Sequence, residues 1–158
     1  MTYQRLCASD SSTQDAGEAF AAVLRPGDVV LLSGRLGAGK TTFVKGVARA
    51  LGVIERVTSP TFIMVRQHDA HNDRGITTLH HADVYRVDHL GDVLDLDLGE
   101  LVEEAGVAIV EWGDLAESVF GREVLTLAFD VDDDEGRRIS AAGSIDAERA
   151  SALEAWAS

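Results

Sequence analysis

Cysteine, basic residues and long apolar stretches are all scarce in this sequence. Cys7 is the only cysteine, so no disulfide can form within the chain, which fits a reducing compartment. Residues 1–7 lack the basic-then-apolar layout of a signal peptide, so we expect a cytoplasmic protein. No stretch approaches the roughly 18 apolar residues that cross a bilayer, and we therefore expect no membrane partner.

The shortage of basic residues limits what the general surface can bind. Lysine and arginine number 14 against 27 acidic residues, which gives a formal net charge of -13 at pH 7. Such a surface repels nucleic acids at long range and is usually only solvated, although a partner with a basic face is an alternative. Four basic residues nevertheless gather within one stretch, which permits a local anion site: Lys40, Lys45, Arg49 and Arg56.

The order of segments predicts a single α/β domain over residues 1–158. Hydrophobic residues make up 46% and charged residues 26% of the chain, and no internal repeat or linker is visible. Wholly apolar runs at 29–32 and 107–110 indicate strands buried on both faces. The remaining expected strands lie at 61–67, 77–84, 123–131 and 137–143, and the expected helices at 13–24, 40–51, in pieces of 90–105, and at 146–156. This alternation predicts a mixed, mostly parallel central sheet.

The clearest motif is a glycine-rich loop between the first buried strand and the helix that follows it. Gly34, Gly39, Lys40 and Thr41 match the full phosphate-loop pattern G-x-x-x-x-G-K-T. Its glycines let backbone N–H groups point at a phosphate, Lys40 adds positive charge, and Thr41 offers a hydroxyl to Mg²⁺. A chance glycine-rich turn is the weaker interpretation, because the flanking strand and helix are the context that the motif requires. We therefore predict a P-loop NTPase-like three-layer sandwich whose nucleotide contacts include Gly37, Ala38, Gly39, Lys40, Thr41 and Thr42.

Two carboxylates follow buried strands and are candidates for the metal side of this site. Asp83 ends the expected strand at 77–84, and Glu111 follows the run at 107–110. Ligands of α/β sheets bind at the carboxyl ends of strands, so either acid could hold the metal or position a water. Acids at strand ends are also common on ordinary surfaces, and the pattern alone leaves the two roles open.

Two further polar groups have equally open interpretations. Ser59-Pro60-Thr61 fits both a switch loop near the γ-phosphate and a simple turn that enters a strand. His80 and His81 are adjacent, so on a strand they face opposite ways, and we expect one of them buried and the other exposed.

Four segments together resemble one protein family, the TsaE (YjeE) family of bacterial tRNA threonylcarbamoyladenosine (t6A) synthesis. The segments that recur in this order are Gly34–Phe43, Thr58–Phe62, His81–Arg86 and Val110–Trp112. The phosphate loop is generic, whereas the Ser-Pro-Thr, His-x-Asp-x-Tyr-Arg and Glu-Trp elements are specific to the family. The resemblance spans roughly residues 10 to 143. One position departs from the family, because Arg35 stands where the family usually has an acid.

The resemblance implies a role for individual residues. It makes Thr41 and Glu111 the ligands of Mg²⁺ and Asp83 the acid that hydrolysis needs, with Lys40 on the phosphates. It also places Trp112 close to the nucleotide. Gly136-Arg137 is similar to a family Gly-Arg that approaches the nucleotide, although the neighbouring Arg138 leaves that register open.

The resemblance further implies an ATPase with ATP and Mg²⁺ as cofactors, slow alone and stimulated by the proteins TsaB and TsaD. TsaD transfers the threonylcarbamoyl group to an adenosine of tRNA, so this chain is expected to meet tRNA only through the complex. A nucleotide-gated binding module with incidental hydrolysis and a small-molecule P-loop kinase are the alternatives. A GTPase is disfavoured, because the guanine-reading pattern Asn-Lys-x-Asp is absent.

Overall fold

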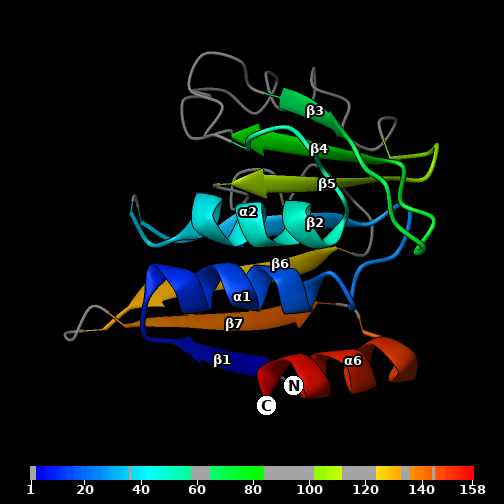
Figure 1. The fold of residues 1–158 in the computed structure, drawn as a ribbon. Coiled ribbons are helices and arrows are strands. Elements are labelled where there is room, and N and C mark those ends of the chain that lie inside the picture. Colours follow the sequence, from blue (N-terminus) through cyan, green and yellow to red (C-terminus); the bar gives the residue numbers. More distant parts are fainter. Residues whose placement is uncertain are drawn as a thin grey trace, which may run out of the picture.

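The computed structural model describes residues 3–35, 37–57, 65–83, 102–111, 124–132, 136–143 and 145–158. Within these ranges, seven strands form one sheet in the order β1-β7-β6-β2-β5-β4-β3 (Figure 1). The strands are β1 (Tyr3–Cys7), β2 (Val29–Ser33), β3 (Val65–Asp69), β4 (Thr78–Asp83), β5 (Gly106–Glu111), β6 (Leu125–Val131) and β7 (Arg137–Gly143). The helices are α1 (Asp10–Phe20), α2 (Lys40–Ala50) and α6 (Ala147–Ala157).

The four central strands are parallel and the outer strands are antiparallel. β6, β2, β5 and β4 pair in parallel, whereas β3 joins β4, and β7 and β1 follow β6, all antiparallel. Every residue of β5 is buried, as are four of the five residues of β2. Full burial explains why both strands read as unbroken apolar runs. The predicted mixed sheet in an α/β fold is confirmed, and its parallel part is limited to these four strands.

α1 and α2 lie side by side over one face of the sheet (Figure 1). A pair of glycines allows this close approach, because a Cβ on Gly17 would lie 2.0 Å from the carbonyl oxygen of Phe43 and a Cβ on Gly46 would lie 1.9 Å from that of Gln14. α6 covers the β1 end of the same layer. The indole of Trp156 donates a hydrogen bond of 2.9 Å to the carbonyl of Ala16, which closes this corner of the core.

Several element boundaries differ from those expected. α1 begins at Asp10 rather than at residue 13, because Ser9 caps it in a capping box with Ser12. β1 was not predicted at all, since exposed Leu6 breaks the apolar alternation that indicates a strand. Helical pieces were expected within residues 90–105, of which the structure describes 102–105. These four residues form a turn, and Ala105 has a positive φ of 66°.

Some expectations lie outside the described residues. These are Ser59-Pro60-Thr61, the first part of the strand expected at 61–67 and most of the helical pieces expected at 90–105.

Each helix in the described ranges has 11 residues, and none is long and apolar enough to span a membrane.

Candidate functional site

The glycine-rich loop connects the carboxyl end of β2 to the first residue of α2. Gly37 and Gly39 both have a positive φ, of 83° and 99°, which side-chain-bearing residues rarely adopt. A Cβ on Gly37 would meet no atom within 4 Å, so the loop opens outward there. Gly39 is the N-cap of α2 and provides no side-chain cap for the first turn. Helix N–H groups that lack a side-chain cap suit an anion such as a phosphate.

Lys40 brings a positive charge into this loop. Its side chain is almost fully buried, with 4% of the residue exposed, and its ammonium donates hydrogen bonds to the carbonyl oxygens of Gly34 and Arg35. The Arg35 side chain is exposed, so the residue that departs from the family pattern takes part here through its backbone. The ammonium therefore lies against the loop that would hold the phosphates.

Half-buried Thr41 and the buried side chains of Glu111 and His81 form a cluster directly beside the loop. The hydroxyl of Thr41 lies 3.0 Å from each carboxylate oxygen of Glu111, and Nε2 of His81 contacts Oε2 of the same carboxylate. Glu111 is 3% and His81 0% exposed. Since an ionised carboxylate can only accept, Nε2 of His81 carries the proton that it donates to Glu111. Nδ1 of His81 is buried and has no hydrogen-bond partner in the described part of the chain.

The expectation that one of the adjacent histidines would be exposed is wrong. His80 and His81 are both buried, with 3% and 0% exposed. β4 lies inside the sheet between β5 and β3, and both of its faces are closed to solvent. Sequence reasoning therefore missed His81 as a partner of Glu111. The signal was present in the motif that begins at His81, but the contact joins two strands that lie 30 residues apart.

Asp83 lies beside Glu111 at the carboxyl edge of the sheet. The Cα atoms of these two residues are partners in the parallel pairing of β4 with β5, and Glu111 is also the partner of Leu32 on β2. Because side chains alternate along a strand, Asp83 faces the same side of the sheet as His81, the side on which Glu111 meets α2. The acids expected at strand ends are thus neighbours next to the loop.

Arg137 lies against the other side of the loop. Its Nε donates a hydrogen bond of 3.1 Å to the carbonyl of Ala38, and its Nη2 lies 3.3 Å from the carboxylate of Asp10. A Cβ on Gly39 would lie 2.8 Å from Nε of Arg137 and would push this side chain away from the loop, and the φ of 99° at this position also favours glycine. Arg138 is exposed. Thr42 is half-buried in the first turn of α2, and Trp112 lies outside the described residues.

The groups at this edge fit a magnesium–nucleotide ligand. A hydroxyl and a carboxylate 3.0 Å apart are hard oxygen donors of the kind that Mg²⁺ prefers. Within the described ranges no group of three or more histidine, cysteine or acidic residues could enclose a metal. An ion held by Thr41 and Glu111 would therefore take its other ligands from phosphate oxygens and water, as Mg²⁺ commonly does.

Comparisons with known proteins agree on one family. The family model described as "Threonylcarbamoyl adenosine biosynthesis protein TsaE" matches residues 7–139. A tRNA threonylcarbamoyladenosine biosynthesis protein TsaE from Treponema pallidum is 39% identical over 138 residues, which covers 86% of this chain and 98% of the relative. The TsaE protein of Bacillus subtilis is 41% identical over 128 residues, which covers 81% and 77%. A crystal structure of Bacillus subtilis YdiB superposes with a TM-score of 0.77 at 31% identity, and the match covers 99% of this chain and 94% of that one.

Proposed function

Because the chain belongs to the TsaE family of tRNA threonylcarbamoyladenosine biosynthesis, we propose that it is the ATP-binding and ATP-hydrolysing component of that machinery. One observation carries the proposal. The buried Lys40 donates to the backbone of an open glycine loop, and the half-buried Thr41, next to it in the chain, contacts the buried carboxylate of Glu111. A positive charge and oxygen donors beside one loop fit a triphosphate bound with its metal.

The proposed chemistry is mainly positioning and charge compensation by residues of this chain. The loop amides and Lys40 bind the phosphate tail, while Thr41 and Glu111 hold Mg²⁺ through their oxygens. When bound, Mg²⁺ supplies the positive charge that polarises the phosphoryl oxygens. Asp83, on the same face as Glu111, orients a water molecule by accepting its hydrogen bond. His81 donates to Oε2 of Glu111 and holds that carboxylate toward Thr41.

We propose slow hydrolysis by the chain alone and stimulation by the proteins TsaB and TsaD. Catalysis of phosphoryl transfer commonly needs an arginine that reaches the transferred group. Of the two described arginines at the loop, Arg35 extends an exposed side chain, and Arg137 is engaged with the carbonyl of Ala38 and the carboxylate of Asp10. The net charge of -13 opposes direct binding of tRNA, so tRNA is reached through the complex, in the cytoplasm.

Two measurements test this proposal. Calorimetry on the folded protein should show uptake of ATP and of ADP that depends on magnesium. ATP hydrolysis should be far below a typical enzyme rate of about 10 s⁻¹ for the chain alone and should rise when the TsaB–TsaD pair is added. Absence of nucleotide binding would refute the site, whereas fast hydrolysis by the isolated chain would refute only the dependence on partners.

A further inference from the structure

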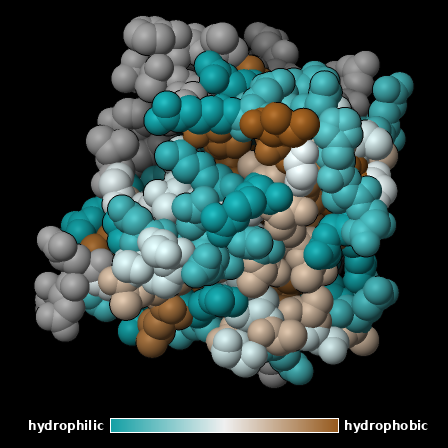
Figure 2. All heavy atoms as spheres, viewed as in Figure 1, coloured by the Kyte–Doolittle hydropathy of each residue, from teal (hydrophilic) through white to brown (hydrophobic). Residues whose placement is uncertain are grey.

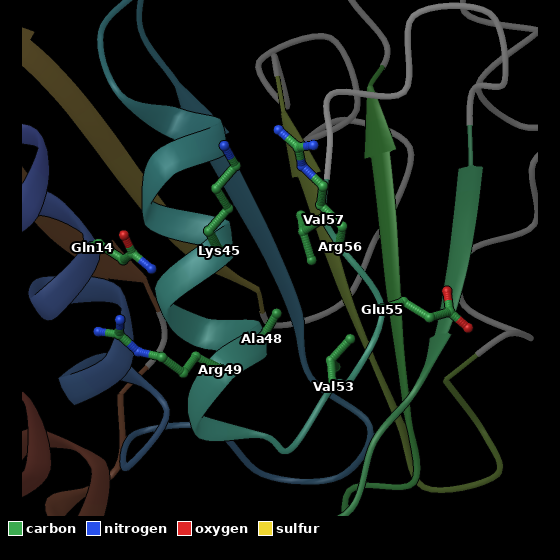
Figure 3. Close-up of a pocket in the computed structure, with 8 residues that line it drawn as sticks. All are labelled: Gln14, Lys45, Ala48, Arg49, Val53, Glu55, Arg56 and Val57. Carbon is green, nitrogen blue, oxygen red and sulfur yellow. The ribbon is translucent and has the colours of Figure 1, made fainter.

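A pocket of about 300 Å³ lies between α2 and the segment that follows it (Figure 3). Its apolar wall consists of Ala48 from α2 together with Val53 and Val57 from the segment. Cationic side chains surround this wall: Lys45 and Arg49 from α2, and Arg56 from the segment. Three cations around one pocket are unusual in a chain that has 14 basic and 27 acidic residues.

The charges around the pocket differ in how they are compensated. Nε of Arg49 lies 3.0 Å from Glu18, and its Nη2 lies 3.4 Å from Asp15, both on α1. The one acid of the lining, Glu55, lies 3.0 Å from Nδ1 of His68 and points away from the α2 side chains (Figure 3).

Lys45 and Arg56, in contrast, are exposed and form no ion pair with any residue in the described ranges. Figure 3 shows the two side chains extending in the same direction from either side of the pocket. Because both side chains are exposed, they can pair with carboxylates of a second molecule.

The segment that lines the pocket also carries an exposed apolar side chain. Ile54, the chain neighbour of Val53, is 89% exposed, and Figure 2 shows hydrophobic atoms at the surface around the segment that follows α2, between hydrophilic ones. An apolar centre rimmed by charged groups is the usual anatomy of a protein–protein contact. The phosphates of a nucleic acid would use the two cations but would leave the apolar wall unused.

We propose that this pocket docks an acidic segment of a partner protein. Carboxylates of the segment pair with Lys45 and Arg56, and an apolar side chain beside them covers Val53 and Val57. The net charge of -13 favours a short segment with a few carboxylates over a long polyanion such as RNA. Lys45 lies four residues after Thr41 on the same helix, so a partner bound here contacts the element that begins at the phosphate loop.

Charge reversal at the pocket tests the inference with the full chain. The inference rests on the proposed function only in its choice of partner, so the first probe is the TsaB–TsaD pair with Mg–ATP present. Arg56→Glu should weaken binding of the pair about tenfold or more, because opposing charges across an interface become like charges. Lys45→Glu combined with Arg56→Glu should weaken it further and flatten the salt dependence. Arg138→Glu changes the net charge by the same amount as Arg56→Glu on the distant strand β7, and it should change the affinity less than twofold.

A second probe does not depend on the identity of the partner. A short synthetic peptide of glutamates around a leucine should shift the amide resonances of Ala48 and Val53, and the same peptide with glutamines should not. Unchanged affinity of the pair in the reversal variants, with ATP binding intact, would overturn the inference and leave the proposed function standing.

Failure of the proposed function has a different signature. If the wild-type chain does not bind the pair, the proposed partners are wrong, and the peptide titration decides the pocket by itself: no shift with the acidic peptide overturns the inference. If the reversals weaken binding of tRNA to the isolated chain and leave the protein pair unaffected, the occupant is a nucleic acid and the inference is also overturned.

Discussion

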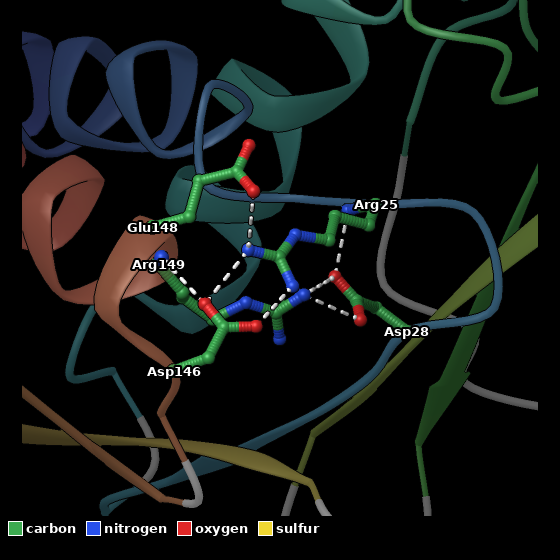
Figure 4. A network of polar contacts seen from close by, with 5 residues as sticks. All are labelled: Arg25, Asp28, Asp146, Glu148 and Arg149. Atoms are coloured by element: carbon green, nitrogen blue, oxygen red, sulfur yellow. Dashed lines mark hydrogen bonds and ion pairs between the residues drawn. The ribbon is translucent and has the colours of Figure 1, made fainter.

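The two ends of the parallel strands use charged side chains in opposite ways. At the amino end, Arg25 and Asp28 in the turn before β2 meet Asp146 and Arg149 at the start of α6 (Figure 4). Arg25 lies 2.7 Å from Asp146, and Arg149 lies 2.9 Å from Asp28. Each of these cations has an acid of the same chain within ion-pair distance, and the pairs join segments that are 121 residues apart in sequence.

At the carboxyl end the charged groups are buried more deeply and are held mainly by neutral groups. The ammonium of Lys40 donates to backbone carbonyls, and the carboxylate of Glu111 accepts from a hydroxyl and an imidazole. Burying an ion costs free energy that such hydrogen bonds offset only in part. The charges at the amino end thus pair with one another and stabilise the fold, whereas those at the carboxyl end are placed where the proposed nucleotide and its metal would use them.

Of the changes considered at the carboxyl end of the parallel strands, replacing Lys40 should reduce function most. Lys40→Ala removes the positive charge from the loop, so we expect at least about a hundredfold loss of ATP hydrolysis and a comparable loss of ATP affinity, as for removal of a preorganised charge-stabilising donor. Thermal stability should change little, because a buried charge is removed together with its cost. Calorimetry with Mg–ATP and a melting curve measure both, with Arg138→Ala as the control that keeps ATP binding. A Lys40→Ala protein that fails to fold would contradict the comparison.

Changing Glu111 separates hydrolysis from mere nucleotide binding. Glu111→Gln keeps groups that hydrogen-bond to Thr41 and His81 but removes the charge, so magnesium should tighten ATP binding about 10- to 100-fold less than in the wild type. Glu111→Ala should abolish tRNA modification in cells while ATP binding and docking to partners persist. Normal modification in the Glu111→Ala strain would instead favour the nucleotide-gated module.

His81→Asn tests a residue that acts through Glu111. Without the hydrogen bond from Nε2 of His81, the carboxylate is less well held, and the magnesium concentration for half-maximal hydrolysis should rise about tenfold. ATP affinity measured without metal should stay unchanged, which a general loss of structure would not allow. His68→Asn is the matched control, because His68 is also fully buried and also contacts a glutamate, Glu55, but lies away from the loop. An equal magnesium effect in both variants would contradict the role given to His81.

Sequence reasoning succeeded where the signal was local. The phosphate-loop pattern, the apolar runs of β2 and β5, and the acids at strand ends are all legible within a few residues. The expected strand at 137–143 matches β7 in full. The strand-end acids Asp83 and Glu111 proved to be register partners, because parallel strands end at the same edge of a sheet.

The features that sequence reasoning missed depend on residues far apart in the chain. β1 forms because Cys7 and its neighbours pair with β7, about 130 residues later in the chain. No pattern in the sequence near Cys7 indicates this pairing. Burial raises the pKa of the Cys7 thiol, which fits a packing residue rather than a reactive one. The ion pair of Arg149 with Asp28 could likewise not be predicted from the sequence, because only the tertiary fold brings these two distant residues together.

Removing Arg149 should lower the stability of the fold through the ion pairs at the amino end of the strands and should leave ATP binding at the carboxyl end unchanged. The side chains of Arg149 and Asp28 are only 11% and 14% exposed, so Arg149→Ala leaves a largely buried carboxylate without its cationic partner and with only the backbone N–H of Arg25 still donating to it. We expect a loss of about 2 kcal/mol in the free energy of unfolding, somewhat below the cost of breaking a fully buried pair. ATP affinity should be unchanged. Glu148→Ala serves as the control, because its side chain is 91% exposed and its contact with Arg25 is 3.7 Å, so its denaturant midpoint should match the wild type.

Asp146 sharpens the comparison at an exposed ion pair, where the smallest effect is expected. The hydrogen bond from Arg25, with the backbone N–H of Arg149, holds the pKa of Asp146 well below its usual range. A carboxyl with a lowered pKa in the folded state stabilises that state above its unfolded pKa of about 3.9, and this stabilisation is lost as the pH falls through the folded value. Asp146→Asn should therefore unfold slightly more easily than the wild type at neutral pH, and the difference should shrink below about pH 3.9. Asparagine still accepts the N–H of Arg149 as a helix cap, so the variant keeps the cap and removes the charged, two-oxygen contact with Arg25. A urea-unfolding difference that grows toward acid would contradict the stabilising role of the pair.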